Sequence, residues 1–127
     1  MCGITGIITK KRDVPIDAML QCITHRGPDD SGVHTLHDND FTVTLAQRRL
    51  SIIDLSPAGH QPMATPDQRY WTTYNGELYN FPELKKKLEK YGHSFRSKTD
   101  TEVLLAAHAQ WGEDAVQKFN GMFAYAL

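Results

Sequence analysis

The chain has 127 residues, of which 40% are hydrophobic, and a formal net charge of −1. This size is sufficient for one domain with a hydrophobic core, and the balanced charge excludes the basic surface of a nucleic-acid-binding protein. No apolar run approaches the length of a membrane span, and charged residues at 10–13 interrupt the first one, which excludes a signal peptide. We therefore expect a cytoplasmic protein, outside the membrane, with Cys2 and Cys22 in the reduced form.

The first half of the chain predicts one helix and three strands. Residues 4–9 indicate a short buried strand. Apolar side chains at positions 16, 19, 20 and 23 follow helical spacing, and a proline at position 15 suits the first turn. The stretch HRGPDDSG predicts a loop because of its Gly, Pro and Asp content. Strands are expected near residues 33–37 and 41–50, since hydrophobic residues alternate in the second of them.

The second half predicts two helices with clear ends. SPAGHQPMATPDQ indicates a loop and YWTTYN a strand. The first helix follows Asn80 as its N-cap and ends at Gly92. The second begins with a capping box of Thr99 and Glu102 and ends at Gly112. A short helix over 113–119 and a strand at MFAYAL complete the chain.

The order and spacing of these elements predict the fold class. Strands and helices come in mixed order with short connections, which indicates an α+β protein, or α/β with antiparallel pairs. Because MFAYAL contains no turn and no polar tail, we expect the sequence to be a piece cut from a longer polypeptide.

Six histidines raise the question of a metal site. The closest pair, His34 and His37, is three residues apart on a predicted strand, so its side chains point to opposite faces. The sequence has no HExxH motif and no paired-cysteine motif. It also has no glycine-rich loop for nucleotide phosphates. We therefore expect no metal and no cofactor in this chain.

Cys2 is the strongest candidate for a reactive group. An initiator methionine is commonly removed when the next side chain is small, and Cys2 would then carry a thiol and a free α-amine. A thiol has a pKa near ~8.5 and an α-amine one near ~7.7–8.0, so the amine can accept the thiol proton near neutral pH. One residue then supplies both nucleophile and base. The alternative is that Cys2 is a small buried side chain.

Four other residues suit acyl chemistry on a small zwitterion, although each also has an ordinary structural interpretation. Asn75 and Gly76 could donate hydrogen bonds to an oxyanion at a strand end, or they could simply form a turn. Arg49 could bind a carboxylate through two hydrogen bonds, or be a solvated surface charge. Asp100 could accept an ammonium group, or only cap a helix.

Several motifs together resemble a known family. MCGITGI, HRGPDDSG, RLSIIDLS, NGELYN and TDTEVLL occur in this order across nearly the whole chain. The sequence is similar to the glutaminase domain of class II glutamine amidotransferases, which are N-terminal nucleophile hydrolases. Within that class, RGPD together with RLSIIDL resembles the glutamine-hydrolysing asparagine synthetases.

The resemblance implies a fold and a set of roles. The fold would be a four-layer αββα sandwich of two mainly antiparallel sheets. Cys2 would attack the side-chain amide of glutamine and form a thioester, with Asn75 and Gly76 as the oxyanion hole. Arg49 would bind the substrate carboxylate and Asp100 its ammonium group. The remaining implied residues line the pocket or lie near the terminal amine: Leu50, Ser51, Ile52, Ile53 and Glu77 for the pocket, and Arg26 and Gly27 for the amine.

The resemblance also implies a larger context. Residues 1–127 would be a glutaminase domain whose ammonia serves an ATP- and Mg²⁺-dependent synthetase domain that is absent here, making asparagine from aspartate. The expected partners are L-glutamine and that synthetase domain. A homodimer is one of the oligomeric states left open. The alternatives are an amidotransferase with another ammonia acceptor, a glutamine-binding regulatory module without turnover, and a structural interaction domain.

Overall fold

The computed structural model describes residues 2–127, so the expected removal of Met1 lies outside the described residues. The first sheet has three antiparallel strands in the order β1-β3-β2. They are β1 (Gly3–Thr9), β2 (Asp30–His37) and β3 (Thr42–Arg49). The predicted loop HRGPDDSG is therefore shorter than expected, because its residues from Asp30 onward pair with the end of β3.

The second sheet is also antiparallel and has the order β4-β5-β6. Its strands are β4 (Met63–Ala64), β5 (Trp71–Leu78) and β6 (Gly121–Ala126). The sequence indicated that Asn75 and Gly76 lie at a strand end, and this was wrong. Both lie inside β5, because Ala124 and Phe123 of β6 pair with them.

Three α-helices accompany the sheets in the described part of the chain. They are α1 (Ile16–Cys22), α2 (Phe81–Glu89) and α3 (Asp100–Trp111). Short 3₁₀ helices lie at η1 (Thr24–Arg26), η2 (Pro57–Gly59) and η3 (Gly112–Lys118). The segment predicted as a short helix over 113–119 is thus 3₁₀, and the predicted loop after residue 56 contains η2 and β4. None of the described helices has the length and apolar character needed to cross a membrane.

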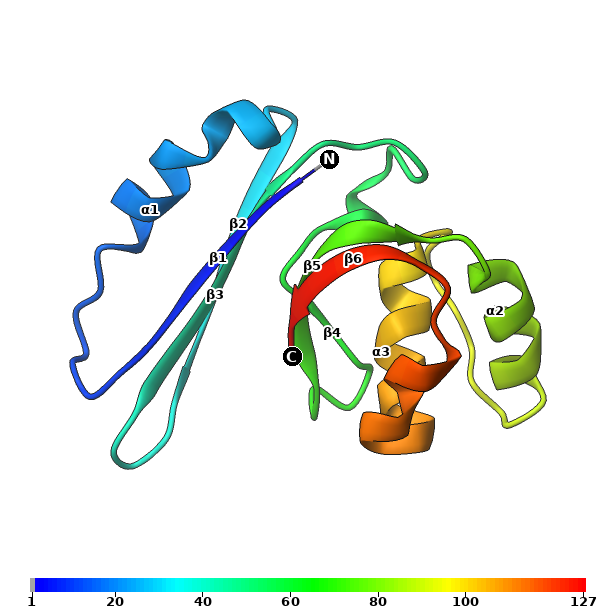
Figure 1. Ribbon diagram of the computed structural model, residues 1–127. Helices are drawn as coiled ribbons and strands as arrows, with labels where there is room; N and C mark the ends of the chain where they lie inside the picture. Colours follow the sequence, from blue (N-terminus) through cyan, green and yellow to red (C-terminus); the bar gives the residue numbers. More distant parts are fainter. Residues whose placement is uncertain (1) are drawn as a thin grey trace.

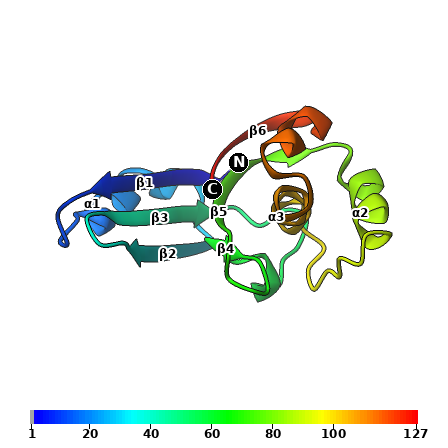
Figure 2. The same ribbon diagram turned by 90° about the horizontal axis from the view of Figure 1, so that it is seen from below.

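The elements form four layers, as the resemblance implied. Figure 1 shows α1 outside the first sheet, the two sheets facing each other, and α3 and α2 outside the second sheet. Figure 2 shows from below that α3 and α2 lie on the side of the second sheet that faces away from β1, β2 and β3. Two buried hydrogen bonds connect the sheets: Thr73 Oγ1 donates to the carbonyl of Ala46 at 3.2 Å, and Gln47 Nε2 donates to the carbonyl of Tyr74 at 2.7 Å. The α+β sandwich predicted from the sequence is confirmed.

The main apolar core lies between the second sheet and the helices. Residues of α3 are buried on most sides, because the helix lies between β5 and α2. Such a helix has apolar residues all round rather than one apolar stripe. The buried residues of this core are Leu84, Leu88, Val103, Ala106, Ala107 and Ala115, and next to them Tyr74, Leu78 and Leu104. The core therefore fixes α3 against the strand that carries Asn75 and Gly76.

Candidate active site

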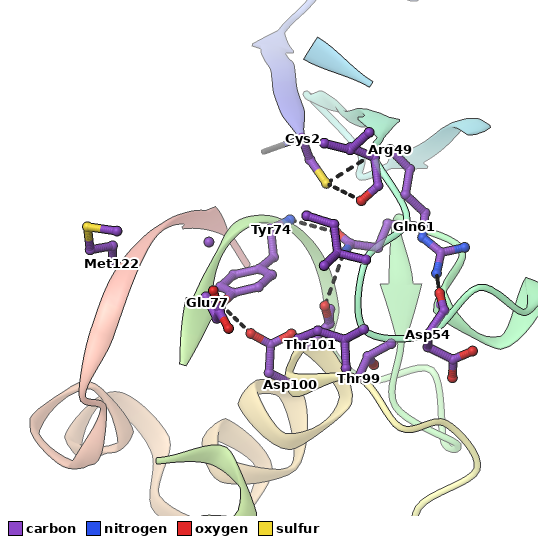
Figure 3. A pocket seen from close by; sticks show the side chains of 15 residues that line it. Cys2, Arg49, Asp54, Gln61, Tyr74, Glu77, Thr99, Asp100, Thr101 and Met122 are labelled. Carbon is purple, nitrogen blue, oxygen red and sulfur yellow. Dashed lines mark hydrogen bonds between the residues drawn. The ribbon is translucent and has the colours of Figure 1, made fainter. Parts of the chain in front are cut away.

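One cavity of about 200 Å³ lies where β1, β3, β5 and α3 meet (Figure 3). It contains most of the residues that the sequence predicted for a glutamine site. Those lining it are Cys2, Arg49, Leu50, Ile52, Ile53, Gly76, Glu77 and Asp100. Ser51, Asn75, Arg26 and Gly27 do not line it. The fold thus brings a thiol, a guanidinium group and three carboxylates to one cavity from four separate segments.

Cys2 is held at the edge of the first sheet by the residue that follows β3. The backbone N–H of Leu50 donates to Sγ at 3.4 Å, and Sγ lies 3.7 Å from the carbonyl oxygen of the same residue. Cys2 is half-buried and makes no disulfide. Cys22, in contrast, is exposed.

Arg49 is the last residue of β3 and is buried, with 7% of its surface exposed. It is therefore not the solvated surface charge that was its alternative interpretation. Its guanidinium donates to the carbonyl of Ser56 at 3.1 Å and to the carbonyl of Asp54. Gly59 leaves space for it, because a Cβ there would lie 2.0 Å from Nη2. The remaining guanidinium N–H groups have no hydrogen-bond partner among residues 2–127, and Arg49 lines the cavity.

Asp100 is the first residue of α3 and is 4% exposed. Its Oδ2 accepts the hydroxyl of Tyr74 at 2.7 Å and the backbone N–H of Leu78 at 3.0 Å. Burial and the hydrogen bond to Asp100 raise the pKa of Tyr74 far above its usual value, so Tyr74 stays protonated and donates. Thr99, not Asp100, caps the helix, since the Thr99 hydroxyl accepts the N–H of Glu102. The carboxylate of Asp100 can therefore accept further hydrogen bonds at Oδ1.

Asn75 and Gly76 differ in where they point. Gly76 faces the cavity, and β6 lies so close to it that a Cβ would come within 2.4 Å of the Met122 carbonyl oxygen. Asn75 does not line the cavity, and its buried Oδ1 has no hydrogen-bond partner among residues 2–127. A buried amide oxygen without a partner is unusual. The pair is thus positioned by strand pairing rather than by a turn.

The other predicted residues lie around the cavity. Ser51 donates its N–H to Asp29 Oδ2 at 2.8 Å, outside the cavity. Arg26 lies beside Gly3, because a Cβ on that glycine would be 3.0 Å from the Arg26 Cβ. Gly27 packs against the end of β3, where a side chain would overlap the Arg48 carbonyl. These contacts put η1 next to the N-terminal strand without bringing it into the cavity.

Sequence reasoning missed five polar or aromatic residues of the cavity, of which Thr99 was predicted only as a helix cap: Asp54, Gln61, Tyr74, Thr99 and Thr101. Asp54 holds the segment after β3 in place, because its Oδ2 accepts the N–H of Lys98 at 3.0 Å. Hydrogen bonds from Ser56 and Lys98 lower the pKa of the Asp54 carboxyl to about 2. The hydrogen bonds that join Gln61 to Tyr74 and Thr101, Tyr74 to Asp100, and Asp54 to Lys98 each span 13 or more positions of the chain, so no local pattern in the sequence marks them.

Known proteins share both the sequence and the fold. Residues 1–127 match the glutamine amidotransferase domain family. Asparagine synthetase [glutamine-hydrolyzing] 1 of Bacillus subtilis is 42% identical over 134 residues, which cover 100% of this chain and 20% of that protein. A putative asparagine synthetase [glutamine-hydrolyzing] 2 of Methanocaldococcus jannaschii is 39% identical over 144 residues, covering 100% of this chain and 27% of that protein. The chain therefore spans about a fifth to a quarter of the length of these relatives.

A solved structure supports the fold. The glutamine phosphoribosylpyrophosphate amidotransferase of B. subtilis superimposes with a TM-score of 0.75 at 20% identity, covering 96% of this chain and 34% of that chain. At this identity the likeness concerns the fold alone. Together with the family match over the whole sequence, it shows that the chain belongs to the glutamine amidotransferase domain family.

Proposed function

We propose that this chain hydrolyses the side-chain amide of L-glutamine and supplies the ammonia for the ATP-dependent synthesis of asparagine from aspartate. One observation carries the proposal: Cys2, Arg49, Gly76 and Asp100 line the same cavity. Free glutamine has a carboxylate, an ammonium group and a carboxamide. The cavity offers a cation, an anion and a nucleophile for these three groups.

The proposed reaction has two steps, and Cys2 takes part in both. After removal of Met1, the α-amine of Cys2 accepts the thiol proton, and Sγ attacks the carboxamide carbon. Collapse of the tetrahedral intermediate breaks the C–N bond, and the amine returns the proton so that ammonia leaves. Water then attacks the thioester and releases glutamate and the thiol. We assign the oxyanion hole of both steps to the N–H of Gly76 and to the side-chain amide of Asn75, which does not line the cavity in this structure and would have to turn into it when glutamine binds.

The α-carboxylate and the α-ammonium group of glutamine are attached to one carbon atom, and we assign them to Arg49 and Asp100. Arg49 donates its free N–H groups to the α-carboxylate, and Asp100 accepts the α-ammonium group. Leu50, Ser51, Ile52 and Ile53 follow Arg49, and we propose that they cover the substrate, with Glu77 beside it. Arg26 and Gly27 are proposed to lie near the amine of Cys2, which agrees with the contact between Arg26 and Gly3. No residue of this chain is assigned to ATP or Mg²⁺, which belong to a separate synthetase domain.

The experiment that tests this proposal measures three products. The 127-residue protein, freed of Met1, is incubated with glutamine in the presence or absence of ATP, Mg²⁺ and aspartate. We expect glutamate and ammonia in equal amounts under both conditions, no asparagine, and loss of both products in Cys2→Ala. Glutamate formation that required ATP would overturn the proposal. Binding of glutamine without turnover would support a regulatory module instead.

A further inference from the structure

The side chain of Gln61 connects two elements of the cavity. Gln61 is 6% exposed, and both ends of its amide are used. Its Oε1 accepts the backbone N–H of Tyr74 on β5 at 2.7 Å, and its Nε2 donates to the hydroxyl of Thr101 on α3 at 3.0 Å. Figure 3 shows the Gln61 amide between these two groups, with Cys2 on one side of the cavity and Asp100 on the other. The connection therefore runs along the length of the cavity.

On β5, the Gln61 side chain makes a hydrogen bond to the backbone at a position where no neighbouring strand does. The ladder between β4 and β5 has only two pairs, Met63 with Thr72 and Ala64 with Trp71, so β4 does not reach Tyr74. A buried backbone N–H without a partner is costly, and the Gln61 side chain satisfies it. The backbone carbonyl of Tyr74 accepts a hydrogen bond from Gln47 Nε2 at 2.7 Å. Two glutamine side chains thus fix the backbone of β5 immediately before Asn75 and Gly76.

On α3, Gln61 fixes the start of the helix. Thr101 directly follows Asp100, and Thr101 is 3% exposed. Asp100 in turn accepts the hydroxyl of Tyr74 at 2.7 Å. A closed set of buried hydrogen bonds therefore joins the two elements through Gln61, Thr101, Asp100 and Tyr74. Both the Oε1 and the Nε2 atom of Gln61 take part in these hydrogen bonds.

We infer that Gln61 is a positioning residue that sets the separation between the oxyanion pair and the ammonium acceptor. This inference rests on the proposed function, in which Asn75 and Gly76 bind the carboxamide end of glutamine and Asp100 binds its ammonium end. The separation selects the length of the amino-acid substrate. Asparagine carries the same groups with one methylene fewer, so a rigid separation disfavours it. A difference of one methylene is worth about 10–200-fold in selectivity.

The test compares glutamine and asparagine binding in variants of the connection. In a Cys2→Ala background, which prevents turnover, calorimetry gives the ratio of the two dissociation constants. Gln61→Met removes both hydrogen bonds at similar side-chain length, and Thr101→Val removes one at similar shape. We expect both to reduce the preference for glutamine by about tenfold or more. Thr101→Ser, which keeps the hydroxyl, should restore the preference.

A matched control separates this role from general destabilisation. Thr44 is a fully buried threonine on β3 whose hydroxyl lies 3.1 Å from that of Thr35, outside the cavity. Thr44→Val should leave the ratio unchanged even if it lowers the melting temperature. If Gln61→Met and Thr101→Val weaken both ligands equally, the inference is wrong. Should one of the two fail to fold, the other decides.

The same measurement distinguishes a failure of the proposed function. If the Cys2→Ala protein with an intact connection binds no glutamine, then glutamine is not the ligand, and both proposals fall. If it binds glutamine and Gln61→Met keeps the full preference over asparagine, only the positioning role is overturned.

Discussion

At the scale of single residues, the chemistry of Cys2 depends on whether its backbone nitrogen is part of a peptide bond or is a free amine. With Met1 attached, the nitrogen is an amide and cannot accept a proton. Without Met1 it is an amine with a pKa near ~7.7–8.0. We predict that active protein has lost one methionine in an intact-mass measurement. A protein that keeps Met1, for example behind a blocked N-terminus, should lose glutaminase activity. Full activity of that form would exclude the one-residue mechanism.

Arg49 gives the second prediction at this scale. A hydrogen bond to a charged group contributes ~1.5–3 kcal/mol, so Arg49→Ala should raise the KM for glutamine roughly tenfold to more than a hundredfold. Arg49→Lys should restore little, because an ammonium group cannot make two parallel hydrogen bonds to a carboxylate. Unchanged glutamine dependence in both variants would remove Arg49 from the site.

Asn75 gives a prediction on turnover rather than binding. Loss of one oxyanion donor reduces kcat by about 10²–10³-fold in comparable sites. Asn75→Ala should therefore slow single turnover while the dissociation constant for glutamine changes little. Its Oδ1 has no partner among residues 2–127, so the substitution breaks no hydrogen bond that this atom makes within the described protein. Loss of binding with normal turnover of bound glutamine would make Asn75 a binding residue instead.

The residues of the site were predictable to different degrees. Cys2, Arg49 and Asp100 were identified because they sit in motifs and at ends of elements. Gln61 and Thr101 were not, because the two residues are 40 positions apart in the chain and their hydrogen bond forms only in the folded molecule. The same holds for Gln61 and Tyr74, 13 positions apart. A motif thus indicated residues that line the cavity, but not the buried side chains that connect the elements around it.

At the scale of elements, the start of α3 carries both a cap and a proposed site residue. The Thr99 hydroxyl accepts the Glu102 N–H at 3.3 Å and lies 2.8 Å from the Ser97 hydroxyl. Thr99→Ala should lower the free energy of unfolding by about 1 kcal/mol, measured in urea, and raise the KM for glutamine, because Asp100 is the next residue. Thr99→Ser should change neither. A KM increase without loss of stability would indicate that Thr99 contacts the substrate.

Local patterns predicted elements well wherever the partners were also local. Thr99 and Glu102 are three residues apart, and the predicted cap is present. Asn80 was expected to cap α2, but its side chain makes no capping bond there. Instead, Nδ2 donates to the Lys118 carbonyl at 2.9 Å and Oδ1 accepts the N–H of Asn120 at 3.0 Å. The Asn80 side chain thus makes its hydrogen bonds to a segment about 40 residues away instead of to α2. The sequence around residue 80 does not contain these partners.

At the scale of the whole molecule, two histidines lie where layers meet. His34 on β2 stacks on Trp71 of β5, with ring centroids 3.3 Å apart, across the gap between the sheets. His108 on α3 lies 2.9 Å from the Tyr125 hydroxyl on β6 and 3.0 Å from the Gly112 carbonyl. Burial lowers the pKa of both histidines below 6.5. The four-layer order was predictable from the resemblance, whereas these contacts between layers depend on the exact register.

These histidines should make the stability of the fold depend on pH. Each pKa is lower in the folded state than in the unfolded state, so the unfolded chain binds more protons, and the free energy of unfolding falls as pH decreases from 6.5 through the folded pKa values. Urea unfolding between about pH 5 and 7.5 avoids the carboxyl groups, which titrate lower. His108→Gln and His34→Gln are compared with the parent protein at each pH. Each substitution should reduce the slope of the free energy of unfolding against pH by an amount that corresponds to at most one proton. An unchanged slope in both variants would show that neither histidine is kept neutral by the packing of the layers.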